Sequence, residues 1–321
     1  MGLVEGLPVL DSLNGQRVLL TGANGFIGSH LLGALQTIGA EVTVLGRDNE
    51  NLASLRARSK CVHTVQADLI SAASTAAAVA PLQPQIVFHL AGYTNVGRGM
   101  EHAVPAMQTN LLGTINLVNG LKAKSVKRFI AVGSSEEYGL ATAPFDETMP
   151  LAPVSHYAAS KAAVSHWCRM VHSTLGFPTV VLRVFLAYGP GDRSDRLIPS
   201  AITAALRGED FPMTSGRQTR ELTYIDDLVQ GFLRAAVAPS AVGEIINLGT
   251  GVEHPVREIV QKIYGLAGKG GRPLFDALPH RNGELWHNYA SVDKATELLN
   301  WRAQVGIDEG LARTVAHYRS L

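Results

Sequence analysis

The 321-residue sequence is poor in cysteine, in charged residues and in long apolar runs. Its two cysteines, Cys61 and Cys168, lie far apart and form no Cys-x-x-Cys pair, which argues against a zinc site or a disulfide framework. We therefore expect no metal, and a reducing cytoplasm is the expected compartment. No apolar run reaches the length of about 18 residues that a membrane span needs, so we expect no contact with a membrane.

Charge is also nearly balanced. The formal net charge is +1, only 17% of the residues are charged, and no long basic run is present. A nucleic-acid partner is therefore not expected. Hydrophobic residues make up 46% of the chain, which is enough for a sizeable core. The length predicts one large domain with an attached lobe, or two domains.

Short apolar segments rich in β-branched residues alternate with amphipathic, helix-like segments through the first half of the chain. Near-continuous apolar strands that are separated by helices predict an α/β fold with a parallel sheet covered on both faces. The expected helices include residues 27–38 and 104–122. The expected strands are residues 17–21, 41–45, 62–66, 86–90, 128–132, 179–183 and 244–248.

Two later segments, residues 188–220 and 268–288, interrupt this alternation with proline, glycine and charged residues. We expect them to build a smaller α/β lobe over the carboxyl edge of the sheet, where open α/β sheets bind ligands. The lobe is thus the expected substrate site. The predicted division is a dinucleotide-binding domain over residues 1–185, to which 223–253 return, and a substrate lobe over 186–222 and 254–321.

A glycine-rich loop follows the first expected strand and opens a helix. It reads TGANGFIG from Thr21 to Gly28. Gly22 permits a tight turn, Gly25 allows backbone to approach a pyrophosphate, and Gly28 allows the helix to pack on the strand. The amides of Phe26 and Ile27 open that helix, whose positive dipole end faces phosphate. A plain turn is the alternative, but the strand–loop–helix context favours a doubly wound Rossmann sheet that binds a dinucleotide.

The tip of the second expected strand bears on which dinucleotide binds. An NAD site places a carboxylate there to accept a hydrogen bond from the ribose 2′-hydroxyl, but this chain has Gly46 followed by Arg47. A guanidinium at this place suits the 2′-phosphate of NADP(H). Arg47 as a solvated surface residue and Asp48 as the ribose ligand are the alternatives. The pattern favours NADP(H) over NAD.

Tyr157 and Lys161, in the segment YAASK, are four residues apart and share one face of a helix. A nearby ammonium lowers the pKa of a phenol, so Tyr157 is expected to exchange a proton with a hydroxyl or ketone while hydride moves. Lys161 could also hold the nicotinamide ribose. The alternative is an ordinary pair on a helix surface.

A second segment with polar side chains, GSSEEYG at residues 133–139, ends an expected strand at the ligand-binding edge. Ser134 can donate a hydrogen bond to the reacting oxygen. Glu136 is a candidate general base if its side chain faces the site, and a solvated loop carboxylate if it does not.

Together these segments resemble the extended short-chain dehydrogenase/reductase family, in its branch of nucleotide-sugar epimerases, dehydratases, decarboxylases and ketoreductases. The resemblance runs from Val18 to about Thr314. Its further markers are Asp68-Leu69, HLAG (89–92), NLLGTINLV (110–118), YGPG (188–191), RELTYIDDL (220–228) and INLGTG (246–251).

The resemblance implies roles for individual residues. Ser134, Tyr157 and Lys161 match the catalytic triad of the family. Other matching positions would contact the cofactor, namely the three loop glycines, Asp68 and Leu69 at the adenine, Leu90, Ala91 and Gly92 after the fourth strand, and the buried helix residue Asn110.

For the substrate, Arg220 and Arg281 resemble the arginines that hold a diphosphate, and surface arginines are the alternative. One departure is Leu186, which stands where the family usually has an asparagine near the nucleotide. Anchoring of the nucleotide is therefore expected to differ.

Three reactions share this machinery. We expect NADP(H)-dependent oxidoreduction at C4 of a nucleotide-diphosphate sugar, with a 4-keto-6-deoxysugar reductase favoured. A 4,6-dehydratase or a 4-epimerase is the alternative, and a non-catalytic NADP-binding sensor is the alternative of another class. By analogy with the family, a homodimer would form through residues 104–122 and 157–173.

Overall fold

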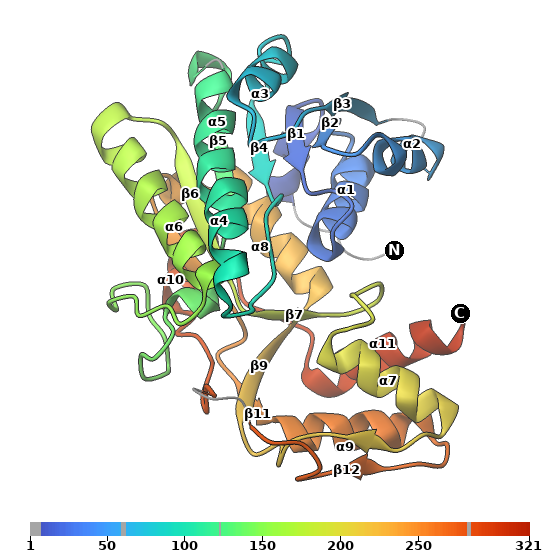
Figure 1. Cartoon of the computed structure of the whole chain (residues 1–321). Helices are drawn as coiled ribbons and strands as arrows, with labels where there is room; N and C mark the ends of the chain where they lie inside the picture. The colour runs from blue at the N-terminus through green and yellow to red at the C-terminus, as the bar shows by residue number, and fades with distance from the viewer. Residues whose placement is uncertain (1–7, 59–61, 122, 281–283) are drawn as a thin grey trace.

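The computed structural model describes residues 8–58, 62–121, 123–280 and 284–321. Within these residues the central element is a parallel sheet of seven strands in the order β10-β6-β5-β4-β1-β2-β3 (Figure 1). Every pair of neighbouring strands in it is parallel. The strands are β1 Arg17–Thr21, β2 Glu41–Gly46, β3 His63–Gln66, β4 Ile86–His89, β5 Arg128–Ser134, β6 Thr179–Val184 and β10 Ile245–Leu248.

Helices cover both faces of this sheet. Val18 and Leu20 of β1 pack into one core with α1 (Phe26–Ile38), α2 (Asn49–Arg58) and α8 (Ile225–Val237). Leu19 points to the other core, beneath α3 (Ala72–Val79), α5 (Gly113–Gly120) and α6 (His156–Leu175). Because side chains alternate across a strand, a strand buried on both faces must be apolar at every position. The predicted Rossmann-type fold and its strands are confirmed, with boundaries moved by one or two residues.

The strand order reverses between β1 and β4. The chain leaves β1 toward β2 and β3 on one side, then returns to β4 on the other side of β1. Loops after β1 and β4 therefore diverge at the carboxyl edge of the sheet. Such a reversal leaves a crevice where open α/β sheets bind ligands, and the glycine loop follows β1 at this point.

One expected helix is interrupted. Residues 104–122 contain α4 (Ala103–Ala106), a π-helical turn over Met107–Leu112 and then α5. A π turn inserts one extra residue into an α-helix and often marks a functional site. Periodicity predicted a single helix because apolar residues continue through the π turn, which ends with Leu111 and Leu112. Asn110 lies inside this turn.

Below the seven-stranded sheet in Figure 1 lies a smaller α/β region. In the described part of the chain, β9 pairs with β7 in parallel and with β11 antiparallel, and β8 pairs with β12. The sequence did not predict these short strands, and the domain limits predicted from it stay a prediction. The elements are β7 Leu186–Tyr188, β8 Phe211–Pro212, β9 Thr219–Tyr224, β11 Glu253–Pro255, β12 Pro273–Leu274, α7 Leu197–Arg207, α9 Val256–Ala267 and α11 Ile307–Arg319. Helix α10 (Asp293–Leu299) packs instead against β10 and α8 of the larger region.

The described residues also form short 3₁₀ turns, namely η1 Pro8–Leu13, η2 Met100–His102, η4 Ala123–Ser125, η5 Ser135–Glu137 and η6 Pro239–Ala241. None of the helices in the described part of the chain could span a lipid bilayer.

Candidate active site

The glycine loop is packed directly against the end of β4. Gly22 has a φ of +76°, and a Cβ added there would lie 2.6 Å from the amide nitrogen of Ala91. A Cβ on Gly28 would lie 2.1 Å from the carbonyl oxygen of Gly22. Gly25 precedes α1 and supplies no side-chain cap, so the backbone amides of Phe26 and Ile27 open the helix without one. These residues form the backbone cradle that a dinucleotide pyrophosphate requires.

The tip of β2 presents no free carboxylate. Gly46 ends the strand, and Asp48 accepts hydrogen bonds from the amide of Glu50 at 2.9 Å and the side chain of Asn51 at 3.2 Å. Asp48 therefore caps the start of α2, which opposes its use as a ribose ligand. Arg47 is exposed beside this tip.

Further cofactor candidates lie after β3 and β4. Asp68 accepts a hydrogen bond from the amide of Ile70 at 3.1 Å, and Leu69 is buried with its carbonyl bound by Asn116 at 2.8 Å. The amide of Leu90 donates to the carbonyl of Thr21 at 3.2 Å. The turn after β3 and the segment after β4 are thus ordered at the same edge as the glycine loop.

A chain of buried hydrogen bonds connects the glycine loop with the π turn. The amide of Ala91 donates to the hydroxyl of Thr21 at 3.0 Å, and this hydroxyl contacts Nδ1 of His89 at 2.8 Å. Nε2 of His89 contacts the hydroxyl of Thr114 at 3.0 Å, and that hydroxyl donates to the carbonyl of Asn110 at 2.5 Å. Since the Thr114 proton is used there, Nε2 must be the donor and Nδ1 the acceptor.

His89 is accordingly neutral. Burial, with a smaller effect of the Lys161 charge, lowers the pKa of His89 to about 3. The sequence analysis quoted His89 only as part of a family marker. Its buried pairing with two threonines depends on three separate segments, so no local signal identifies it.

Asn110 extends the same connection to α6. Its Oδ1 accepts from the amide of Tyr93 at 2.7 Å, while its Nδ2 donates to the Tyr93 carbonyl at 3.1 Å and to the hydroxyl of Ser160 at 2.7 Å. Ser160 in turn donates to the carbonyl of Tyr157 at 2.7 Å. Asn110 therefore positions the segment after β4 relative to the helix that carries Tyr157.

Lys161 lies at the junction of these elements. Its Nζ donates to the carbonyl of Val132 in β5 at 2.7 Å, and a Cβ added to Gly92 would lie 3.5 Å from it. The side chain is buried, and this burial lowers the pKa of Lys161 to about 8. The Lys161 ammonium is therefore close to Gly92, and a group bound against the segment after β4 would lie near it.

Tyr157 lies in the first turn of α6, whose start is capped by the hydroxyl of Ser155. Its phenol is hydrogen-bonded to Ser134, the last residue of β5. The expectation that Lys161 lowers the pKa of Tyr157 is wrong. Burial, together with the charges of Glu137 and Glu136, raises the pKa of Tyr157 to about 12.

A cavity of about 640 Å³ adjoins these residues. Glu136 is among its lining residues, as are Ser155 and Arg98, and the role of Glu136 as a base stays a prediction. The remaining lining residues are Asn95, Val96, Gly97, Val154, Arg220, Glu284 and Leu285.

Arg220 lines this cavity and is already paired with an acidic side chain. Its Nη2 lies 2.5 Å from the carboxylate of Glu284, and its Nη1 donates to the carbonyls of Thr219 and Leu285 at 2.7 Å. An anionic ligand must therefore compete with Glu284 for the guanidinium. The other predicted diphosphate ligand, Arg281, lies outside the described residues.

Sequence reasoning missed Glu137 and Glu284. Glu137 is fully buried, and its carboxylate lies 2.8 Å from Nε of Arg183. An arginine inside the otherwise apolar strand β6 was the available signal, because a buried guanidinium requires an anionic partner. No comparable signal existed for Glu284, which adjoins Arg220 only through the fold.

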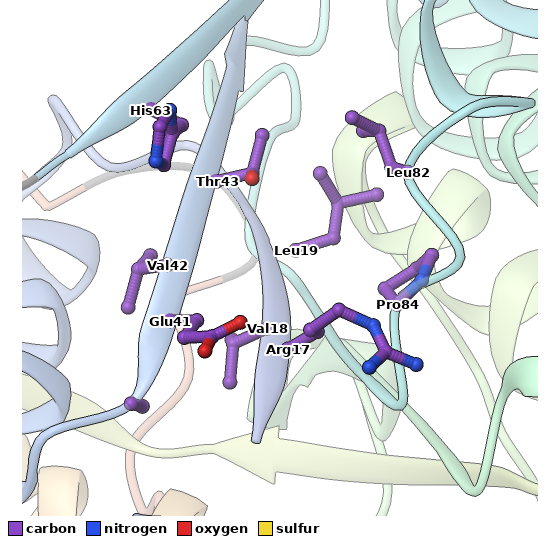
Figure 2. A pocket seen from close by; sticks show the side chains of 10 residues that line it. Arg17, Val18, Leu19, Glu41, Val42, Thr43, His63, Leu82 and Pro84 are labelled. Atoms are coloured by element: carbon purple, nitrogen blue, oxygen red, sulfur yellow. The ribbon is translucent and has the colours of Figure 1, made fainter. Parts of the chain in front are cut away.

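A second cavity, of about 260 Å³, lies at the opposite edge of the sheet. Figure 2 shows Arg17 and Glu41 at the start of β1 and β2, with Leu82 and Pro84 across from them. None of the predicted site residues that the structure describes lines it. In the described part of the chain, no group of three or more His, Cys, Asp or Glu side chains is arranged to hold a metal ion.

Comparisons with known proteins agree with this geometry. The model of the NAD dependent epimerase/dehydratase family matches residues 18–249. A UDP-glucose 4-epimerase of Mycolicibacterium smegmatis is 33% identical over 319 residues, which cover 95% of this chain and 99% of the relative. A dTDP-glucose 4,6-dehydratase of Xanthomonas campestris pv. campestris is 31% identical over 327 residues, with 94% and 92% covered.

A solved structure is similar over the same length. The UDP-glucuronic acid 4-epimerase from Bacillus cereus, in complex with UDP-glucuronic acid and NAD, superposes with a TM-score of 0.84 at 28% identity and covers 95% of this chain and 99% of its own. Fold, site and sequence therefore agree, and the chain belongs to the NAD dependent epimerase/dehydratase family, as an enzyme of the extended short-chain dehydrogenase/reductase type.

Proposed function

We propose that this enzyme carries out NADP(H)-dependent oxidoreduction at C4 of a nucleotide-diphosphate sugar, and that it works as a 4-keto-6-deoxysugar reductase. The observation that carries the proposal is the hydrogen bond between Tyr157 and Ser134 beside a cavity lined by Glu136 and Arg220. The relatives named above are enzymes of nucleotide sugars, which supports the substrate class.

Each residue then has a chemical role. The nicotinamide cofactor supplies the hydride when it is bound. Ser134 donates a hydrogen bond to the C4 oxygen, and Tyr157 transfers its proton to that oxygen. Lys161 places an ammonium next to Gly92 and balances the charge that develops on the phenol. With its pKa raised to about 12, Tyr157 carries its proton at neutral pH, which suits reduction of a ketone.

Arg220 would bind the substrate diphosphate. Its guanidinium lines the cavity, and a planar fork of N–H donors matches phosphate oxygens. The diphosphate would replace the Glu284 carboxylate, which occupies one side of that fork at 2.5 Å. Binding energy gained there, away from the reacting carbon, would position the sugar. Arg281 remains a second proposed diphosphate ligand.

The proposed cofactor is NADP(H). Gly46 provides no carboxylate, Asp48 caps α2, and Arg47 is exposed at the strand tip. Gly46→Asp should move the preference toward NAD at least tenfold, because the new carboxylate accepts from the 2′-hydroxyl and repels a 2′-phosphate. The added Cβ would lie 2.9 Å from Cδ2 of the buried Leu52, so this side chain must shift slightly. Arg47→Ala should weaken NADPH alone, and an equal loss for NADH would contradict the assignment.

A 4,6-dehydratase is the second candidate, favoured by Glu136. This carboxylate lines the cavity, and removal of a proton from C5 needs a base there. A relative that is 31% identical is a dTDP-glucose 4,6-dehydratase. Glu136→Gln separates the two reactions, because a reductase should keep most of its kcat while a dehydratase should lose about 100-fold or more.

The direct test mixes the enzyme with NADPH and a panel of 4-keto-6-deoxy nucleotide sugars. Loss of the NADPH absorbance with formation of the 4-hydroxy sugar is the expected result. No loss of NADPH, together with a 4-keto product from a nucleotide hexose without added reductant, would establish the dehydratase instead. Interconversion of C4 epimers without net redox change would establish the epimerase.

Tyr157→Phe distinguishes an enzyme from a cofactor-binding sensor. The phenol oxygen is the proton donor, so kcat should fall by about 10³ or more while the dissociation constant of NADPH stays within threefold. Turnover equal to that of the wild type would reject the catalytic assignment.

The proposed assembly is a homodimer through the π-containing helix and α6, which pack side by side. Exposed apolar side chains that support it are Met100, Val104, Met107, Leu112 and Met170. Val104→Glu should convert the dimer to a monomer in sedimentation experiments. Val252→Glu, at an exposed apolar residue after β10, is the matched control and should leave the dimer intact. A monomeric wild type would refute the assembly.

A further inference from the structure

A buried ion pair lies next to Ser134. Glu137 and Arg183 are both almost completely inaccessible to solvent, and Oε2 of Glu137 lies 2.8 Å from Nε of Arg183. Neither residue is assigned a contact with the reacting oxygen in the hydride transfer proposed above, although the Glu137 charge helps to raise the pKa of Tyr157. A buried ion pair contributes little net stability, because desolvation of both charges offsets their attraction. The role of this ion pair is therefore sought in the contacts that Glu137 and Arg183 make with other residues.

The carboxylate of Glu137 joins three elements. Oε1 accepts from the backbone amide of Ser134 at the end of β5, at 2.8 Å. Oε2 accepts from the hydroxyl of Ser165 in α6 at 2.7 Å, as well as from Arg183 in β6. The backbone there is shaped around the carboxylate, since a Cβ added to Gly133 would lie 2.6 Å from Oε1.

Ser165 follows Lys161 by four residues, and Lys161 follows Tyr157 by four. The three side chains thus lie one helical turn apart on the same face of α6. Lys161 contacts β5 directly through the carbonyl of Val132, and Ser165 contacts it through Glu137. The helix is held to the strand at two successive turns, and both contacts lie beyond Tyr157 in the chain.

We propose that Glu137 is a positioning residue, which fixes Ser134 relative to helix α6 so that Ser134 and Tyr157 reach the same substrate oxygen. The inference rests on the proposed hydride transfer. Arg183 holds the carboxylate in place from β6 and is itself fixed by the hydroxyl of Tyr138, at 2.9 Å, which donates to Asn247 at 2.8 Å.

Two double variants test this without leaving a buried charge unpaired. Glu137→Gln with Arg183→Met keeps an acceptor for the Ser134 amide and a partner for Ser165. Glu137→Leu with Arg183→Met removes both contacts. The first should keep kcat within about threefold of the wild type. The second should lose about tenfold or more in kcat with KM and NADPH affinity within threefold, since a small displacement of a catalytic group is costly.

Either of two results would overturn the proposal. One is a folded Leu/Met variant with kcat within threefold of the wild type, and the other is an equal loss in both variants, which would assign the effect to charge rather than to position. If the Leu/Met variant does not fold, Ser165→Ala should lower kcat about threefold. Ser173→Ala is its control, because that hydroxyl bonds only within α6. Equal rates in these two variants would also overturn it.

A wild type without turnover on any nucleotide sugar would refute the proposed function rather than this inference. Hydrogen exchange then decides the inference. In the Leu/Met variant, or in Ser165→Ala if that variant does not fold, the amide of Ser134 should exchange at least tenfold faster than in the Gln/Met variant, while β6 and β10 stay unchanged. Equal exchange at Ser134 would overturn the positioning role.

Discussion

The two edges of the central sheet belong to the same strands but differ in how their polar groups are satisfied. At the amino edge, backbone pairs close the turns, such as Glu41 donating to the carbonyl of Gln16 at 2.9 Å and Gln85 to that of Arg17 at 2.8 Å. At the carboxyl edge, side chains such as those of His89 and Asn110 make the hydrogen bonds that join neighbouring segments. Backbone pairs close most of the amino-edge turns with some help from side chains, such as Gln85 Oε1 accepting from the Arg17 amide at 3.1 Å. The carboxyl edge depends more on residue identity, and the chemistry is proposed there.

Glycines at the two ends of α1 give the sharpest contrast. Gly22→Ala, at the carboxyl edge, should weaken NADPH binding by about 100-fold or more, because the Cβ meets the backbone of Leu90 and Ala91, just after β4, at a positive φ. Gly39→Ala, at the amino edge, also has a positive φ of +86° but meets only the side chain of Asn14. It should cost about 1 kcal/mol of unfolding free energy and leave NADPH affinity unchanged. Calorimetry and fluorescence titration check both.

Arg220 of β9, which lines the larger cavity, and Arg17 at the amino edge extend the comparison to substrate. Arg220→Ala should raise KM for the nucleotide sugar roughly 10- to 100-fold through lost charge-assisted hydrogen bonds. Glu284→Gln should leave KM unchanged or lower it up to about threefold, since it weakens the competing carboxylate. Arg17→Ala, at the amino edge, should not move KM. A higher KM in Glu284→Gln would show that the ion pair, not the free guanidinium, binds substrate.

His89 at the carboxyl edge should make the stability of the protein depend on pH. The pKa of His89 is about 3 in the folded protein and near 6.5 when unfolded, so the unfolded state binds the extra proton between these values. Above pH 6.5 His89 is neutral in both states and the free energy of unfolding carries no penalty from it. As pH falls from 6.5 toward 3, that free energy falls by about 1.4 kcal/mol per pH unit. Denaturant unfolding of His89→Gln should show a correspondingly shallower loss between pH 6.5 and 5. Identical slopes would mean that His89 is charged in the fold.

The smallest effect is expected in the amino-edge cavity of Figure 2. Thr43→Val there should change the unfolding free energy by no more than about 0.5 kcal/mol and leave kcat and KM unchanged. A clear loss of activity would break the contrast between the edges and would assign a function to this second cavity.

The sequence predicted the sheet well because its strands are apolar on both faces and its glycine loop has a local pattern. The sites after β1, β5 and in α6 were predictable for the same reason, since each is carried by a short segment such as residues 157–161. The strands of the smaller region were not, because β8 has only two residues and β9 (TRELTY) carries Arg220 and Glu221 in place of a continuous apolar run. Contacts between distant segments, such as Glu137 with Arg183 and Arg220 with Glu284, follow only from the fold.

The π turn at Met107–Leu112 has a consequence for how this protein tolerates changes in length. Deleting one residue from that turn would let an uninterrupted α-helix form, which is the lower-energy backbone. The same deletion would rotate everything on one side of it by about 100°, given 3.6 residues per turn, and turn Asn110 away from Tyr93 and Ser160. A shortened helix would be more regular, but Asn110 would no longer hold the segment at Tyr93 to α6. In the described structure, no other side chain of this helix is hydrogen-bonded to both of these segments.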